Sequence, residues 1–509
     1  MIQKKRRVVY DTKGESLTSI QIQELVAALD CKEKQKELSE LEHIQVLLLT
    51  EGTLSVENIL DMYDYGIISN LSLLMREADY ELVSGALKCN LAIYKNSDYK
   101  DYIVKLGTLT FLHDLLVCNN DMNMRFNLGN SPNSTVSTNL CITDNIDDTI
   151  IYNTLLCVYY IITDYKELNA NEIQQIISIC TCCINSQNNT IVYRTFSLLR
   201  SLSSRSESIA NSIMNNSIFS CIISKCDFFN SLVISNDISP TTNVSHGNNI
   251  SSTTDENSFN SIQSLLLSFI GNMCSHQDDL CKNILSNESI SLFLCKSLNN
   301  PDINIIKKTL WCFSNVFLSS NDILKSIVTD NLINCLIYIL NNNYDIQREI
   351  AMCFHNLFIC HQVEYGHCLL IPAVIDGFFK RLITSDPRDM LIYVDILLYI
   401  VEHCQFQTRH IILENRSLLE NIAYNTELPE HLIEKGQDIL NIIDTYIEMD
   451  DSVSYNNNNN NLNNNNLNNN NLNNNNLNNN NLNNNNLNNN NPHNNNKKQN
   501  TLFNYFSRV

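Results

Sequence analysis

Residues 309–315 read TLWCFSN, and residues 350–356 read IAMCFHN. A third segment of the same kind, LLSFIGN, occupies residues 266–272. Each segment ends in Asn, and the three Asn residues are 43 and 41 residues apart. Apolar residues recur in each segment at helical spacing. The pattern therefore predicts helices that repeat with a period of about 42 residues.

The same step extends the pattern in both directions. Toward the N-terminus, the 42-residue step reaches further apolar helical segments if two stretches rich in Asn, Ser and Thr are loop insertions. These stretches lie at about 120–147 and 232–257. Nine positions then mark the repeat, and we call them the landmarks: Leu48, Asn90, Val158, Arg200, Asn272, Asn315, Asn356, Leu398 and Leu440. A period of roughly 40–47 residues of stacked helices is typical of HEAT and armadillo solenoids. We therefore expect an all-α solenoid of about nine repeats over residues 38–448.

The composition agrees with a long helical array. The 509 residues include only 11 Gly and 7 Pro, which argues against folds that need Gly-rich turns or phosphate-binding loops. The net charge is −20, and the last 54 residues contain no acid, so the charge lies on the array. This balance argues against direct binding of nucleic acid and favours a basic protein or peptide partner.

Several functions are not expected. Nineteen cysteines follow a basic and then polar N-terminus without a signal-peptide pattern, which favours reduced thiols. No uncharged apolar run reaches the ~20 residues of a membrane span. The stretch CHQVEYGHC at 360–368 offers zinc ligand types but no CxxC partner, so we expect no metal. We find no GxSxG, HExxH or P-loop motif, and we expect neither a cofactor nor an enzyme.

The two ends of the chain differ from the array. Residues 1–37 are predicted to be a basic, mostly flexible segment, and residues 449–496 a linker made largely of Asn. Leu recurs there every five residues, a period that forms no stripe on a helix and alternates faces on a strand. The tract therefore buries no face, and we expect it to be disordered.

The segments around Trp311 and Asn356 resemble the third helices of armadillo repeats in the importin-α family. The segments YGIISNL at 65–71 and LGTLTFL at 106–112 resemble that family's second helices. The resemblance covers residues 38–448 as a period and is sharp at about 260–385. It implies a right-handed superhelical solenoid whose third helices line a concave peptide-binding groove. In that family Asn side chains hold the peptide backbone, and Trp rings pack against its lysine stems.

Position by position, Asn90, Asn272, Asn315 and Asn356 match the Asn ladder of the family, and Trp311 alone matches its Trp array. An Asn side chain offers a peptide group both a donor and an acceptor. A Trp one turn earlier packs the CH₂ stem of a lysine and attracts its ammonium group. The alternative is that these residues serve stacking and hydrogen bonding between repeats.

The array departs from the family pattern at several places. Ala86, Ser268 and Met352 stand where the family has Trp, and Arg200 occupies one ladder position. Most of the Trp-lined sites for the lysine side chains of a peptide are therefore missing, and Arg200 would repel a basic peptide. A groove for a different extended peptide is the alternative that this departure leaves open.

The N-terminal patch Lys4, Lys5, Arg6 and Arg7 has three interpretations. In the importin-α family an N-terminal basic segment binds importin-β, and this patch is shorter and poorer in Arg. A plain nuclear-localisation signal and a solvated terminus are the other two interpretations.

Residues 497–509 form a distinct motif after the Asn tract. Gln499, Leu502, Tyr505 and Phe506 match the Q-x-x-hydrophobic-x-x-aromatic-aromatic pattern of a PCNA-interacting box. A single 3₁₀ turn would place the three apolar side chains on one side, as a plug for the sliding clamp of DNA replication. The alternative is a tail that docks on its own array or has no role.

These patterns predict two functions. The first is an importin-α-like adaptor that binds extended, basic peptides in nuclear protein import, present in the cytoplasm and nucleus. The second is an armadillo scaffold recruited to the replication and repair clamp through residues 497–509.

Overall fold

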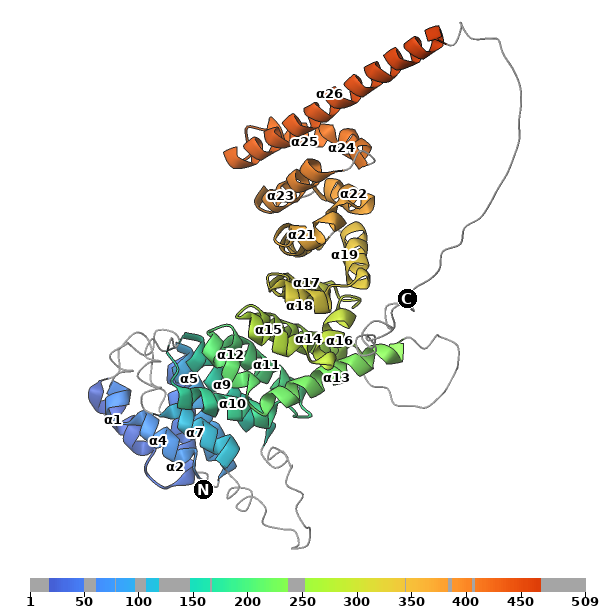
Figure 1. Cartoon of the computed structure of the whole chain (residues 1–509). Helices are drawn as coiled ribbons and strands as arrows, with labels where there is room; N and C mark the ends of the chain where they lie inside the picture. Colours follow the sequence, from blue (N-terminus) through green and yellow to red (C-terminus); the bar gives the residue numbers. More distant parts are fainter. Residues whose placement is uncertain are drawn as a thin grey trace, which may run out of the picture. The chain divides into compact units, whose positions relative to one another are not determined.

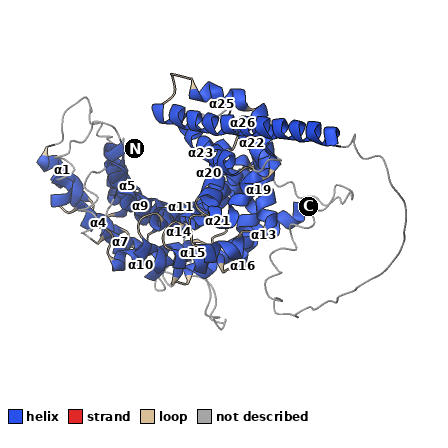
Figure 2. Cartoon of the chain, turned by 45° about the horizontal axis from the view of Figure 1, so that its top comes forward, coloured by secondary structure: helices blue, strands red, loops and turns tan. Residues whose placement is uncertain are grey.

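The computed structural model describes residues 18–49, 61–77, 79–96, 107–118, 147–164, 167–236, 252–343, 345–382, 387–404 and 408–467. Every regular element in these ranges is a helix (Figure 2). The chain divides into an N-terminal unit, Met1–Lys296, and a C-terminal unit, Ser297–Val509. Each unit has its own stack of helices.

The N-terminal unit contains thirteen described α-helices and one π-helical turn; the last helix, α16, reaches its boundary. They are α1 (Ser19–Ala28), α2 (Lys34–Leu49), α4 (Ile67–Leu74), α5 (Tyr80–Asn96), α7 (Thr108–His113), η1 (Asp114–Cys118), α9 (Asp148–Asp164), α10 (Ala170–Cys183), α11 (Asn189–Ser203), α12 (Glu207–Met214), α13 (Ile218–Asn236), α14 (Ser252–Cys274), α15 (Asp278–Leu285) and α16 (Glu288–Ser297).

The C-terminal unit continues the same alternation of short and long helices. Its described elements are α17 (Ile303–Val316), α18 (Asn321–Ile327), α19 (Asp330–Asn342), α20 (Gln347–Phe354), η3 (His355–Ile359), α21 (Gln362–Tyr365), η4 (Gly366–Leu370), α22 (Pro372–Leu382), α23 (Pro387–His403), α24 (Arg409–Glu414), α25 (Arg416–Ala423) and α26 (Glu430–Leu467).

The nine landmarks fall on nine helices, which we call the landmark helices: α2, α5, α9, α11, α14, α17, α20 with η3, α23 and α26. In the N-terminal unit α2, α5, α9, α11 and α14 pack on one another in this order. In the C-terminal unit α17, α20, α23 and α26 do the same, and Figure 1 shows α19, α22 and α24 along their side. The predicted all-α solenoid is confirmed.

The contacts also show how the stack passes the two insertions. Helix α5 packs directly on α9, and α11 packs directly on α14, although an insertion separates each pair in sequence. A second layer runs beside the landmark helices of the N-terminal unit, in the order α4, α7, α10 and α13. In the sequence, each insertion falls between a helix of this second layer and the next landmark helix. The stack therefore keeps its order across both.

Two of the few glycines begin helices of the second layer. Gly66 precedes α4 with φ 88°, and Gly107 precedes α7 with φ 75°. A side chain is strained in this left-handed region, whereas Gly adopts it freely. The two segments that the sequence predicted as second helices therefore start at the same kind of backbone turn.

Buried cysteines join consecutive landmark helices. The Sγ atoms of Cys89, Cys157 and Cys353 donate to carbonyl oxygens on the preceding landmark helix, over 3.1, 3.8 and 3.0 Å. A small apolar thiol fills the tight space between two helices and still satisfies its weak donor. Burial raises the pKa of the Cys89 thiol to about 12. These contacts give the abundant cysteines a structural role.

The array begins earlier than the sequence predicted. The predicted flexible segment 1–37 contains helix α1 and the start of α2. Thr18 and Gln21 form a capping box at the start of α1. Ile22, Leu25 and Val26 are buried, at the spacing of one helix face. This short amphipathic pattern was missed because it lies before the first clear repeat.

Two other boundaries also differ from the prediction. Helix α13 continues to Asn236, and α14 begins at Ser252, so both helices enter the predicted loop 232–257. Helix α26 passes the predicted end of the array at 448 and reaches Leu467, inside the Asn tract. Extending an existing helix requires no new nucleation step, so a helix can continue beyond its last buried residue. Residues 468–509 lie outside the described residues.

In the described part of the chain, no single helix has the length and apolar content to cross a membrane, and one bent pair, α18 with α19, passes that test by length and composition.

Candidate functional site

Trp311 and Asn315 lie one turn apart on α17, and both are half-buried. Their face is the side of α17 that the core does not cover, since Leu310 and Phe313 point into the core. The Nζ atom of Lys308 lies 5.5 Å from the centroid of the Trp311 ring. The chain's own lysine thus occupies the ring face on which the resemblance places a peptide lysine.

Asn356 lies on η3, next to α17 in the stack, and is only 5% exposed. Its Nδ2 donates to the carbonyl oxygen of Ser314 over 2.9 Å. Ser314 is in the last turn of α17, where carbonyl groups have no partner within their own helix. The Asn356 amide therefore caps the C-terminus of the preceding landmark helix.

Asn272 on α14 has the same role in the N-terminal unit. Its Nδ2 donates to the carbonyl oxygen of Arg200 over 3.0 Å and to the Ser203 Oγ over 3.2 Å. Both partners are in the last turn of α11, which ends at Ser203. Asn272 remains half-buried, so part of its side chain still faces solvent.

A histidine follows each of these asparagines and completes the cap. His276 Nε2 lies 2.7 Å from the Ser203 carbonyl oxygen, and His361 Nε2 lies 2.9 Å from the Phe317 carbonyl oxygen. His361 Nδ1 also lies 2.7 Å from Asn321 Oδ1. His361, part of the CHQVEYGHC stretch, is thus engaged in helix packing. In the described residues, no group of three or more His, Cys, Asp or Glu could hold a metal ion.

Asn90 on α5 is 1% exposed and bonds within its own repeat. Its Nδ2 donates to the Ala86 carbonyl oxygen over 3.1 Å, and its Oδ1 accepts from the Tyr94 hydroxyl over 3.0 Å. The structure therefore places the predicted ladder in two settings. Asn90 and Asn356 are buried and bonded to the protein, whereas Asn272 and Asn315 are partly exposed.

A polar cluster on α9 and α11 was missed by the sequence analysis. The Arg194 guanidinium lies 5.6 Å from the centroid of the Tyr152 ring and 5.5 Å from that of Tyr193. Its Nη2 donates to the Tyr152 hydroxyl over 3.3 Å, and its buried Nε has no hydrogen-bond partner in the described residues. Tyr152 and Arg194 are 42 residues apart, which equals the repeat period. This spacing is the feature of the sequence that could have revealed the cluster.

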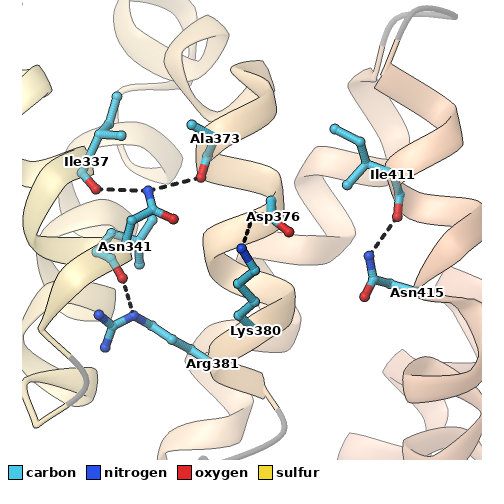
Figure 3. A network of polar contacts seen from close by, with 9 residues as sticks. Ile337, Asn341, Ala373, Asp376, Lys380, Arg381, Ile411 and Asn415 are labelled. Carbon is cyan, nitrogen blue, oxygen red and sulfur yellow. Dashed lines mark hydrogen bonds and ion pairs between the residues drawn. The ribbon is translucent and has the colours of Figure 1, made fainter.

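Arg381 forms a third helix cap, and it is 0% exposed (Figure 3). From α22 its Nη2 donates to the carbonyl oxygens of Ile339 and Asn343, over 3.1 and 2.8 Å, and its Nε donates to that of Leu340. These carbonyls form the C-terminal end of α19. They carry the partial negative charge of the helix dipole, which stabilises a cation. The sequence analysis did not single out Arg381, because its partners lie about 40 residues away in the chain.

Asn341 ties the same two helices together. Its Nδ2 donates to the carbonyl oxygens of Ile337, on its own helix, and Ala373, on α22, over 2.9 and 3.2 Å (Figure 3). The adjacent Lys380 instead pairs with Asp376 at 2.5 Å on an exposed face of α22. The buried and exposed members of the Lys380–Arg381 pair thus have different surroundings.

Two hollows lie away from the predicted residues. One, of about 720 Å³, is open and lined by polar side chains of α10, α12 and the turn after α12, Gln174 and Asn211 among them. The other, of about 250 Å³, lies at α4 and α7, where Arg76 stacks on Phe111 at 4.6 Å. Neither includes a ladder asparagine. The N-terminal patch Lys4, Lys5, Arg6 and Arg7 and the motif residues Gln499, Leu502, Tyr505 and Phe506 lie outside the described residues.

No family model matches the chain, and no curated protein matches it. Among solved structures, an engineered protein from a structural genomics consortium superposes with a TM-score of 0.51 at 14% identity, over 84% of this chain and 99% of that chain. Computationally designed armadillo repeat proteins for modular peptide recognition give 0.40 at 12% identity, over 58% of this chain and 99% of that one. Another designed armadillo repeat protein gives 0.39 at 12% identity, with the same coverage.

The repeat itself decides the fold class. Three helices make up one period, as in α12 to α14, α15 to α17 and α18 to α20. Periods of about 42 residues with up to three helices are those of HEAT and armadillo solenoids. The fold is an armadillo-like helical solenoid. Its third helices are the landmark helices, so the predicted ladder residues of this armadillo-like array lie on the elements that the sequence assigned to them.

Proposed function

We propose that the chain is a scaffold that binds an extended peptide across the exposed faces of its landmark helices. The observation that carries this proposal is that half-exposed polar and aromatic side chains lie on the landmark helices of each unit. Tyr152 and Arg194 occupy equivalent positions on adjacent helices of the N-terminal unit, and Trp311 and Asn315 lie on α17 in the C-terminal unit.

The spacing of the stack suits an extended chain. Packed helices are about 8–10 Å apart, and an extended peptide advances about 3.3 Å per residue. Every third residue of a peptide that crosses the helices therefore meets the next landmark helix. Each unit has one ladder amide that keeps exposed surface for a peptide, Asn272 in the N-terminal unit and Asn315 in the C-terminal unit, whereas Asn90 and Asn356 are buried.

A binding experiment tests this proposal. Random 16-residue peptides displayed on phage are selected on the full-length chain, and the enriched peptides are titrated by fluorescence anisotropy. For peptides that bind at α17, Trp311→Ala is expected to weaken binding about tenfold, because a buried aromatic anchor dominates a small interface. Tyr338→Ala is the matched control, an exposed aromatic on α19 outside the landmark helices. Failure to enrich any peptide, or equal losses in both variants, would contradict the proposal.

Two finer proposals follow from the sequence. Nuclear import rests on the resemblance to the importin-α family, with basic cargo in the groove and importin-β at Lys4–Arg7. Recruitment to the replication clamp rests on the motif Gln499 to Phe506. In both cases the chain acts as an adaptor in the cytoplasm or nucleus, and no step requires catalysis, a cofactor, nucleic acid or a membrane.

One affinity-capture experiment separates these two proposals. The full-length chain is compared with a variant in which Lys4, Lys5, Arg6 and Arg7 are Ala, and with Phe506→Ala. Capture of importin-β that is lost only in the first variant supports nuclear import. Capture of the sliding clamp that is lost only with Phe506→Ala supports recruitment to the clamp, because that ring is the expected plug of the motif. A partner that persists in its corresponding variant rules out that site.

A further inference from the structure

Helix α11 carries positive charge that no acid of its own offsets. This helix contains Arg194 and Arg200 and neither Asp nor Glu. Arg200 is exposed at the landmark position, and the described residues provide no ion pair for it. Its guanidinium therefore keeps a charge that a carboxylate of a ligand can neutralise.

Neighbouring aromatic rings fix the orientation of the Arg194 side chain. The rings of Tyr152 and Tyr193 pack against its guanidinium, and the Tyr152 hydroxyl accepts one of its five donors. Stacking on aromatic rings fixes the plane of a guanidinium without neutralising its charge. A fixed guanidinium loses little side-chain entropy when it binds a carboxylate through two parallel hydrogen bonds.

Two acids on the landmark helices that precede α11 are already engaged. Glu81 on α5 pairs with Lys34 at 2.7 Å, and Asp148 at the start of α9 accepts from the Asn188 side chain over 2.8 Å. Both lie in the first turn of their helices, where the helix dipole also stabilises them. They therefore do not serve the arginines of α11.

The C-terminal unit also has a landmark helix with basic residues and no acid. Helix α17 contains Lys307 and Lys308 and no acid, and Lys308 lies over the Trp311 ring. A lysine of an incoming basic peptide would have to displace Lys308 and would meet like charge. An acidic side chain would instead pair with the two lysines beside the ring.

We infer that the landmark helices bind an acidic extended peptide, with its carboxylates at Arg194 and Arg200. This inference rests on the proposed peptide-binding function and reverses the charge of the expected ligand. The net negative charge of the chain does not oppose it at close range, because at physiological salt charges more than about 8 Å apart are largely screened. Much of that charge lies elsewhere, for example on Asp278 and Asp279 at the start of α15.

Three degenerate 12-residue peptide libraries test the inference against the full-length chain. They differ only at four fixed positions, which carry Glu, Gln or Lys. We expect the Glu library to bind about tenfold more tightly than the Gln library and to weaken as salt increases. Arg200→Gln and Arg194→Gln should each reduce binding of the Glu library about fivefold. Lys282→Gln, an exposed lysine on α15, should leave it unchanged.

The outcomes distinguish the inference from the proposed function. Tightest binding of the Lys library, or equal binding of all three, overturns the inference and leaves peptide binding in place. No binding of any library overturns both. Since Arg194 packs against two rings, its variant can also disturb the fold. Arg200 is exposed, and an unchanged affinity of Arg200→Gln for the Glu library overturns its assigned role.

Discussion

Replacing Arg381 with Met should lower the free energy of unfolding of the C-terminal unit by about 3 kcal/mol. Three carbonyl groups at the end of α19 would lose a charged donor, and each unsatisfied buried polar group costs about 1–3 kcal/mol. Met fills much of the same volume, so the loss reports the polar contacts rather than a cavity. Urea unfolding followed by the fluorescence of Trp311, the single Trp of the chain, measures this unit directly.

The neighbouring residue provides the control. Lys380→Met removes a cation of similar length that is exposed and paired with Asp376 in the same helix. Exposed pairs of this kind contribute about 0.3–0.5 kcal/mol. Equal destabilisation by the two substitutions would show that Arg381 does not act as the cap of α19.

Asn356→Ala is expected to destabilise the same unit by about 2 kcal/mol. The substitution removes the donor to the Ser314 carbonyl oxygen at the end of α17 and leaves a small space between two packed helices. Asn315→Ala, one period earlier, changes a half-exposed residue and should cost under 1 kcal/mol.

The two asparagines should also separate in binding. Asn315→Ala is expected to weaken a peptide bound at α17 while the urea midpoint stays near that of the wild type. Asn356→Ala should shift the midpoint and affect binding only through the fold. A large stability loss in Asn315→Ala would show that the two residues share one structural role.

The periodicity of the sequence was enough to predict the stack, because each period places one apolar face against the next. It predicted even which helices meet across the insertions, such as α5 and α9. It did not predict that Asn356 is buried and Asn315 half-exposed. The spacing of i and i+4 residues places a side chain on a helix face but does not say which neighbouring helix covers that face.

The scarcity of Gly had a consequence that composition alone did not show. Helices often end at a Gly that lets the backbone cap its own carbonyl groups. Here α11, α17 and α19 end without a Gly, and side chains of the following repeat supply the caps: Asn272, Asn356 and Arg381. Such partners are more than thirty residues away, so local sequence could not reveal them.

The buried cysteines give the chain its own set of probes for partial unfolding. Of the seventeen thiols whose burial the structure describes, Cys360 alone is exposed, and the others are buried or half-buried. Burial keeps the pKa of thiols such as Cys89 high, and the reactive thiolate is scarce until a segment opens. Alkylation followed by mass spectrometry would measure when each cysteine becomes accessible during unfolding, and therefore in which order the repeats open. The array thus records the order in which it comes apart, without an added label.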